Sequence, residues 1–316
     1  MVYTSSKTDI IITISIDGFI KFWRKLFHGM EFMKTFRAHP GRCSGTTLSW
    51  NGSYFASTSM SDQSLKFFDV VNADMINMYK LDFDSSICEF IYKLNEAKPT
   101  IAVAESQKTR IHILQLDDKL KKVKLLDFHL APIRIITFNP QLEVVVSIDT
   151  KGIVEYWSAD TYEFPKKKLK FEYKLETDYI ELAKNKILVL SATISHNGEL
   201  MACYGKDRVI RIYMFKTGKL YRKFYETFEM YSEWQKDKES TMLTLDKIEY
   251  DRRLVLEKEI DKSIEFISPP NVLFNETDNY VLWTSYLGIK VVHLGRNKVN
   301  IVNKQVAYSV IRKDGM

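Results

Sequence analysis

One short segment of the sequence has the spacing of a catalytic nucleophile. Residues 41–45, Gly-Arg-Cys-Ser-Gly, place a cysteine between two glycines, as in the strand-to-helix elbow that exposes the nucleophile of many hydrolases. That elbow needs a helix after it, with an acid and then a histidine further along the chain. Here Leu48 and Trp50 lead into an Asn-Gly turn, a pattern that predicts a strand. We therefore interpret residues 41–45 as part of a β-structure and expect no hydrolase activity.

Other catalytic and cofactor signatures are missing from the sequence. It has no Gly-x-x-x-x-Gly-Lys-[Ser/Thr] phosphate loop and no His-Glu-x-x-His zinc motif. Its three cysteines, Cys43, Cys88 and Cys203, are too far apart for a zinc-ligand pair, and an odd number does not indicate a disulfide framework. We expect no cofactor, no metal and no small-molecule substrate, and a reducing, intracellular environment.

A basic stretch with aromatic neighbours is a candidate contact for RNA or for an acidic partner. Its members are Lys166, Lys167, Lys168 and Lys170, with Tyr162, Phe164, Phe171 and Tyr173 on either side. Basic residues can hold a nucleic-acid backbone while aromatic rings stack on single-stranded bases. The alternative interpretation is a solvated loop between two structural units. Arg252 and Arg253 are a second candidate contact.

A repeated four-residue pattern indicates which elements position these residues. In each copy an apolar and a polar residue precede an apolar residue and a large apolar or aromatic one, the alternation of a half-buried strand. The copies are residues 20–23, 65–68, 111–114, 154–157, 210–213 and 289–292. Their last residues are 45, 46, 43, 56 and 79 positions apart. The first three intervals match the WD-repeat period of about 40–45 residues.

Each copy belongs to a longer unit of one design. A turn, as at Asn51-Gly52, precedes an apolar strand, an acidic turn and the repeated strand; Asn-Gly suits such turns because both residues tolerate positive φ. A polar outer strand, such as Glu31 to Phe36, completes the four strands of a propeller blade. The sequence therefore predicts an all-β WD-repeat β-propeller over residues 1–316, with six recognisable four-stranded blades. Gln305 to Ile311 predicts the first strand of a seventh.

Histidines and acidic residues recur at fixed places in these units. His39 lies 29 residues before Phe68, and His129 lies 28 before Trp157, the layout in which WD repeats bury a His–Ser–Asp–Trp hydrogen-bonded network. We call such a network a blade lock and favour it over catalysis or metal binding. Phe68 has no N–H to donate, so its blade cannot complete the network. The predicted lock residues are His39, Asp62, His129, Ser147, Asp149, Trp157, Asp17, Trp23 and Asp207.

The longest interval predicts a helical insertion at about residues 226–263. Its later part, Leu243 to Lys262, has neither glycine nor proline and is rich in charged residues, leucine and isoleucine. The apolar residues form an imperfect amphipathic stripe, namely Leu245, Ile248, Leu254, Leu256 and Ile260. We expect a helix packed beside the propeller, with a partner-docking helix as the alternative.

Segments between the repeats resemble one family, the peptidylprolyl isomerases that carry WD repeats. They are Asp69–Met78, Phe171–Tyr179, Glu181–Lys186, Tyr250–Leu254 and Leu287–Val291. The resemblance implies that a cyclophilin-type isomerase domain follows the propeller, and that the protein is nuclear and associated with spliceosomes. The chain ends at Met316 without a match to cyclophilin active-site segments, so we expect no isomerase activity from its residues.

Composition agrees with a binding role. The chain has 316 residues, 45% hydrophobic and 27% charged, with a formal charge of +6, values ordinary for a folded globular protein. It shows neither a signal peptide nor an apolar run of about 18 residues, so we expect no membrane contact. The leading hypothesis is a non-catalytic protein-interaction scaffold with spliceosomal partners. The alternative is an RNA-binding propeller that uses the basic aromatic stretch.

Overall fold

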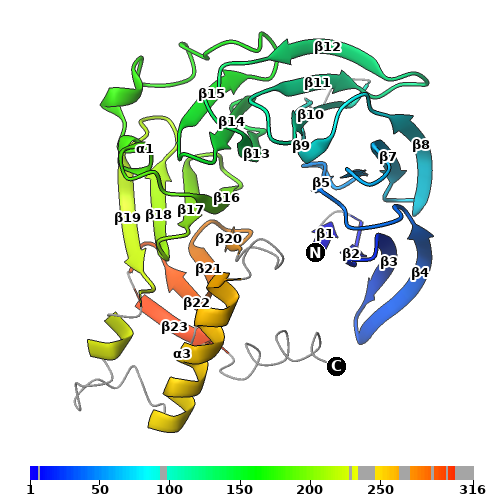
Figure 1. Cartoon of the computed structure of the whole chain (residues 1–316). Helices are drawn as coiled ribbons and strands as arrows, with labels where there is room; N and C mark the ends of the chain where they lie inside the picture. Colours follow the sequence, from blue (N-terminus) through cyan, green and yellow to red (C-terminus); the bar gives the residue numbers. More distant parts are fainter. Residues whose placement is uncertain are drawn as a thin grey trace. The chain divides into compact units, whose positions relative to one another are not determined.

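The computed structural model of the chain describes residues 1–5, 8–92, 98–227, 230–233, 246–262, 271–285, 288–296 and 298–302. It divides into two compact units, Met1–Lys167 and Lys168–Met316, and each is described by itself. Antiparallel sheets dominate both units, and the chain completes one sheet before it begins the next (Figure 1). The described strands form six sheets, which confirms the predicted repeat.

Unit 1 contains four sheets, called blades 1 to 4 in chain order. Blade 1 is β1 (Val2–Ser5), β2 (Ile10–Ile14), β3 (Phe19–Leu26) and β4 (Gly29–Arg37). Blade 2 is β5 (Gly45–Leu48), β6 (Tyr54–Ser59), β7 (Ser64–Asp69) and β8 (Asp74–Lys80). Blade 3 is β9 (Ser85–Phe90), β10 (Thr100–Glu105), β11 (Ile111–Gln115) and β12 (Lys121–Leu126). Blade 4 is β13 (Ile133–Asn139), β14 (Val144–Asp149) and β15 (Val154–Ser158).

Unit 2 contains blades 5 and 6 and the helical segments. Blade 5 is β16 (Val189–Ile194), β17 (Leu200–Gly205), β18 (Val209–Met214) and β19 (Leu220–Tyr225). Blade 6 is β20 (Val272–Phe274), β21 (Tyr280–Ser285), β22 (Gly288–His293) and β23 (Lys298–Val302). Its helical segments include η1 (Lys174–Glu176), α1 (Ile180–Lys184) and α3 (Lys247–Lys262).

The strands follow from alternating residue types, and the tight turns from glycine. In β2, Ile10, Ile12 and Ile14 are buried while the residues between them are partly exposed, because successive side chains point to opposite faces. Gly18, in the turn before β3, has φ +84°, and a Cβ there would lie 2.2 Å from the His39 carbonyl oxygen. Only glycine fits this turn, which brings the start of the repeated strand against the segment that carries His39.

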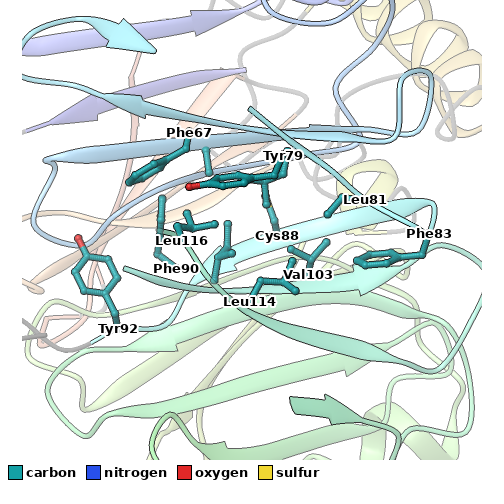
Figure 2. Close-up of a cluster of buried hydrophobic side chains, with 13 residues drawn as sticks. Phe67, Tyr79, Leu81, Phe83, Cys88, Phe90, Tyr92, Val103, Leu114 and Leu116 are labelled. Atoms are coloured by element: carbon teal, nitrogen blue, oxygen red, sulfur yellow. The ribbon is translucent and has the colours of Figure 1, made fainter. Parts of the chain in front are cut away.

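Apolar cores lie between consecutive blades of a unit. Between blades 2 and 3, Phe67 and Tyr79 pack with Phe90, Val103 and Leu114 (Figure 2). A second cluster joins blades 1 and 2, a third joins blades 3 and 4, and a fourth joins blades 5 and 6. Each sheet therefore buries side chains on a neighbouring sheet of its own unit, as propeller blades do.

Blade 4 corrects the prediction of four strands in every unit. Its sheet has three strands, because the chain turns back after β15 instead of adding an outer strand. The Ser158 N–H donates to the Glu163 carbonyl at 2.8 Å, and Tyr162 packs against Trp157. Pro165 follows, and its missing N–H disfavours a strand ladder there.

The insertion is helical, but its predicted limits and buried stripe need correction. Helix α3 begins at Lys247 rather than Leu243, and residues 243–245 lie outside the described part of the chain. Ile248 was expected in the apolar stripe but is 77% exposed. Gln305 to Ile311, the predicted seventh-blade strand, also lies outside the described residues. No helix in the described ranges is long and apolar enough to cross a membrane.

Candidate functional site

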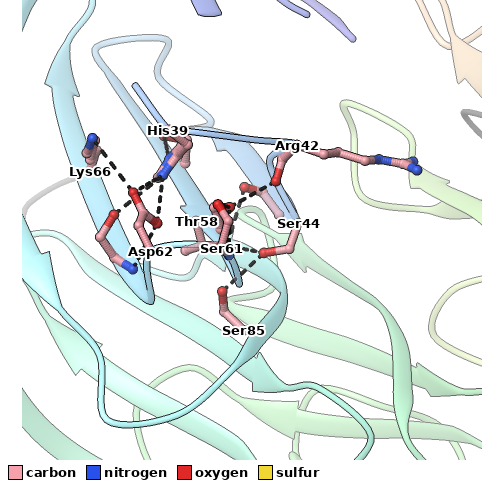
Figure 3. A network of polar contacts seen from close by, with 12 residues as sticks. His39, Arg42, Ser44, Thr58, Ser61, Asp62, Lys66 and Ser85 are labelled. Carbon is pink, nitrogen blue, oxygen red and sulfur yellow. Dashed lines mark hydrogen bonds and ion pairs between the residues drawn. The ribbon is translucent and has the colours of Figure 1, made fainter. Parts of the chain in front are cut away.

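The blade 2 lock joins the segment before β5 to the turn between β6 and β7. His39 Nδ1 lies 2.9 Å from Asp62 Oδ2, and His39 Nε2 lies 3.0 Å from Ser57 Oγ (Figure 3). A carboxylate only accepts, so Nδ1 carries the proton and Nε2 accepts from the Ser57 hydroxyl. Phe68 occupies the tryptophan position and packs in the core. The lock therefore has three members.

Burial sets the protonation of the groups around this lock. The His39 side chain is fully buried, which lowers its pKa although Asp62 opposes the effect. Burial also raises the pKa of the Cys43 thiol to about 11, so this cysteine is a thiol rather than a nucleophilic thiolate at neutral pH. A strand, β5, begins at Gly45. The elbow geometry of a hydrolase is therefore absent from residues 41–45.

The blade 4 lock joins three of its four predicted members by hydrogen bonds. Ser147 Oγ lies 2.7 Å from His129 Nε2 and accepts a bond from Trp157 Nε1 at 3.2 Å. Asp149 departs from the prediction, since its Oδ2 lies 3.8 Å from His129 Nδ1 and neither atom has a hydrogen bond. Asp149 Oδ1 instead accepts the backbone N–H groups of Lys151 and Ile153, both at 2.9 Å. The carboxylate thus fixes the turn and makes no hydrogen bond to His129.

In blade 1 the predicted lock residues are not brought together. Asp17 is exposed and accepts a hydrogen bond from Ser15 Oγ, which lowers its pKa. Trp23 is half-buried, and its Nε1 donates to Thr13 Oγ1 at 2.9 Å. No histidine in the described chain precedes this blade, so the network has no centre. Asp17 and Trp23 as members of a buried lock are a wrong prediction.

Asp207 belongs to an ionic network instead of a histidine lock. It accepts from buried Arg211 at 2.6 and 3.1 Å. Arg211 also donates to Glu181 of α1 at 3.2 Å, and Glu181 accepts from Lys223 of β19 at 2.7 Å. The bond from Lys223 is the largest influence that lowers the Glu181 pKa. The network attaches α1 to blade 5, a role that the sequence did not reveal.

Blade 6 contains a buried ionic cluster that the sequence analysis missed. Lys290 Nζ donates to Glu226 Oε1 at 2.6 Å, and the residues are 4% and 2% exposed. Trp283 Nε1 donates to the same oxygen at 2.9 Å, and the Tyr231 hydroxyl donates to Oε2. The one signal in the sequence was Lys290, the polar member of the sixth repeated strand.

Glu89 is a second acid that the sequence did not single out, and it is half-buried. Its Oε2 accepts from Thr47 Oγ1 at 2.8 Å, which links β9 to β5. Burial raises its pKa to about 7, and bonds from Thr47 and the Phe138 backbone offset part of that effect. Glu89 therefore connects inner strands of blades 2, 3 and 4.

The basic aromatic stretch offers few aromatic rings to a ligand. Lys166, Lys167 and Lys170 are exposed and Lys168 is half-buried. Phe171 is 6% exposed, whereas Tyr173 is 65% exposed. Of the four aromatic residues, Tyr173 alone is exposed, because Tyr162 and Phe164 are also partly covered. The lysine charges are accessible to solvent, but most of the aromatic rings that were expected to stack on bases are partly or fully buried.

The two arginines of the second candidate contact, Arg252 and Arg253, differ in their exposure to solvent. Arg252 is exposed, whereas Arg253 is 8% exposed and donates to Glu249 one turn earlier at 2.6 Å. Tyr250 on the same helix lies 3.0 Å from Ser232 Oγ. Arg253 is therefore a packing residue, and its prediction as a partner contact is wrong.

Comparison with known proteins identifies the fold and the relatives that share it. The WD domain, G-beta repeat model matches residues 30–69. The β-propeller domain of Cps50 (Swd1) from Myceliophteria thermophila superposes with a TM-score of 0.65 at 13% identity, covering 96% of this chain and 85% of that one. The peptidylprolyl isomerase domain and WD repeat-containing protein 1 of Homo sapiens and of Mus musculus is 39% identical over 304 residues. The chain is thus similar, over almost its whole length, to the WD-repeat portion of peptidylprolyl isomerase and WD repeat proteins.

The match to this family covers most of the chain but only part of each relative. Alignment to the human and mouse proteins covers 95% of the chain and 46% of their length. The peptidyl-prolyl cis-trans isomerase CYP71 of Arabidopsis thaliana is 34% identical over 93% of the chain and 46% of its own length. The chain thus spans about half the length of the relatives it matches, and it corresponds to the WD-repeat propeller portion of the family. The predicted propeller is confirmed.

Proposed function

We propose that this chain is the protein-interaction module that holds a peptidylprolyl isomerase of its family at splicing assemblies in the nucleus. The observation that carries the proposal is the alignment of 95% of the chain to relatives named for an isomerase domain and a WD repeat. In this arrangement the propeller contributes binding, and catalysis belongs to a separate isomerase domain.

The placement of the chemically capable side chains supports a binding role. His39, His129 and Cys43 are all buried and serve packing or hydrogen bonding between strands. Within the described ranges, no three His, Cys, Asp or Glu residues gather in a way that could hold a metal ion. The sheets are therefore a rigid support, and the exposed loops and outer strands are the surfaces open to recognition.

A protein partner is favoured over RNA by the burial of most aromatic residues in the basic stretch. Base stacking needs accessible ring faces, and Phe171 in the basic stretch is buried. The lysines that remain exposed would attract acidic protein surfaces as well as phosphates. We therefore place protein recognition first.

Affinity purification of the tagged chain from nuclear extract tests the proposal. We expect the chain to recover proteins of the splicing machinery both with and without ribonuclease treatment, because the contacts are between proteins. The tagged chain should also accumulate in the nucleus under fluorescence microscopy. Recovery that disappears with ribonuclease, together with a steep salt dependence of RNA binding, would establish the RNA-binding alternative. Failure to enrich splicing proteins under either condition would contradict the proposal.

A further inference from the structure

The hairpin of β3 and β4 is longer than its counterparts in the neighbouring blades. β3 has 8 residues and β4 has 9, against 6 and 7 for β7 and β8 and 5 and 6 for β11 and β12. Strand β2 pairs with β3 only as far as Arg24, opposite Ile10. Beyond that point β3 and β4 pair only with each other. The hairpin therefore extends past β2, the strand of the same blade that pairs with β3.

The end of the hairpin, residues 24–32, carries several exposed apolar side chains. We call it the hairpin tip. Phe27 is 95% exposed, Met30 62%, Phe32 51% and Leu26 47%. Met30 and Phe32 lie on one face of the hairpin, Leu26 lies on the other and Phe27 lies in the turn. Exposed apolar residues scattered singly are ordinary, but several gathered at the end of one hairpin mark an interaction site.

Backbone pairing holds this group in a fixed arrangement. Leu26 pairs with Gly29 across a two-residue turn, and Lys25 pairs with Met30. Gly29, at φ +113°, permits that turn, and the Lys25 N–H donates to the Asp9 carbonyl at 2.7 Å. The Phe32 ring meets the Trp23 ring edge to face at 5.4 Å. An ordered apolar group binds with little loss of conformational entropy.

The charge around the tip indicates the chemistry of its partner. Five exposed basic residues of the hairpin, Lys21, Arg24, Lys25, Lys34 and Arg37, stand against one exposed acid, Glu31. Lys34 is paired with Asp74 of blade 2 at 2.8 Å, while Glu31 faces Arg24 at 3.8 Å. The hairpin therefore has a net positive charge, and Arg24 and Lys25 place part of it at the tip. An acidic segment with large apolar side chains is complementary in both respects.

We propose that the hairpin tip is a docking site for an acidic segment of a partner protein that carries large apolar side chains. The aliphatic share of the tip favours protein over RNA, because Leu26 and Met30 have no ring on which a base could stack. Methionine in particular adapts its shape to different apolar partners. This inference rests on the proposed protein-interaction function and assigns it a surface.

Fluorescence anisotropy with defined probes tests the proposal. The probes are a labelled peptide of alternating glutamate and leucine or phenylalanine, the same peptide with lysine in place of glutamate, and labelled oligouridine. Co-sedimentation measures binding to vesicles of phosphatidylserine and phosphatidylcholine. We expect the wild-type chain to bind the acidic peptide, more weakly at high salt, and to prefer it to the lysine peptide.

Paired variants connect that binding to the tip. Phe27→Ser with Met30→Ser should weaken acidic-peptide binding about tenfold or more, as expected for central apolar anchors. Arg24→Glu with Lys25→Glu should weaken it at low salt. Leu130→Ser, a 77% exposed apolar residue elsewhere, and Lys119→Glu with Lys121→Glu are matched controls that should bind normally. Circular dichroism and melting temperature check that each variant folds.

The results separate this proposal from the broader function. The docking site is refuted if the wild-type chain does not bind the acidic peptide, or if the tip variants bind it as well as the controls do. It is also refuted if the tip variants lose oligouridine or vesicle binding instead. If the tip variants still recover the wild-type set of splicing proteins from nuclear extract, the docking-site proposal is refuted and the scaffold proposal is retained. If the wild-type chain recovers no splicing proteins, the scaffold proposal itself is refuted.

Discussion

Replacing Glu89 with glutamine tests whether burial raises the pKa of this carboxyl group, which lies between the inner strands of blades 2 and 3. The Glu89 carboxylate accepts from Thr47 at 2.8 Å, and burial raises its pKa from 4.5 to about 7. Glutamine has nearly the same shape, and its amide oxygen can accept the same hydrogen bond. The substitution therefore removes the ionisation and leaves the packing in place.

The size and sign of the effect follow from the difference between the folded and unfolded pKa. The unfolded chain releases this proton near pH 4.5, whereas the folded chain holds it until about pH 7. The folded state thus binds more protons in this window, so stability that is fully present below pH 4.5 is lost as the pH rises through 7. At about 1.4 kcal/mol per pH unit the upper limit is about 3 kcal/mol. Partial exposure of Glu89 reduces it.

Melting curves of the wild type and Glu89→Gln at several pH values measure this effect. For 316 residues, an unfolding entropy of about 2.1 cal/mol/K per residue converts 1 kcal/mol to about 1.5 °C. We expect the melting temperature of the variant, relative to wild type, to rise by up to about 4 °C between pH 5 and pH 8. Exposed Glu163→Gln is the control and should show no such trend. A wild-type-to-variant difference that stays constant with pH would refute the burial argument.

Three further predictions concern the blade 4 lock, the Lys290–Glu226 ion pair and the absence of catalysis. Trp157→Ala should lower the free energy of unfolding by about 3–5 kcal/mol, and His129→Ala by about 1–3 kcal/mol, in chemical denaturation; half-buried Trp23→Ala is the control and should cost less. Lys290→Met should cost about 3–5 kcal/mol because it leaves Glu226 buried without its cation, and adding Glu226→Gln should recover much of the loss. The purified chain should not accelerate isomerisation of a proline test peptide, a reaction slow enough that weak catalysis would be visible.

The blade architecture was predictable because it depends on short-range pattern. Alternating side chains, as in β2, and turns such as Asn51-Gly52 are local properties, and the observed strands agree with them. Blade 4 is the exception, since its missing outer strand follows from packing of Tyr162 on Trp157. Pro165 was the one local sign of that change.

The side-chain networks were less predictable because their partners are distant in sequence. His39 and Asp62 are 23 residues apart, whereas Lys290 and Glu226 are 64 apart and come from different segments. Spacing within one repeat could suggest the first pair, but no repeat rule connects the second. For the same reason the 3.8 Å separation of His129 and Asp149 could not be read from residue types.

The repeated strand nevertheless contains a signal that links several of these networks. Its second residue is polar in every copy, and in four blades it contacts an acid. Lys66 lies 3.9 Å from Asp62, and His112 lies 3.5 Å from Glu105. Arg211 and Lys290 lie 2.6 Å from Asp207 and Glu226.

In these four blades the position joins the repeated strand to a nearby turn, strand or inserted segment through a basic residue and an acid. A buried pair of this kind is strongly destabilising to break from one side. Substitution there in one partner alone is expected to be tolerated poorly, whereas paired replacement by neutral residues is expected to be tolerated. The acid can come from the preceding turn, as Asp207 does, or from a segment far along the chain, as Glu226 does. The repeat thus specifies where an ionic contact is made, while the inserted segments specify its partner.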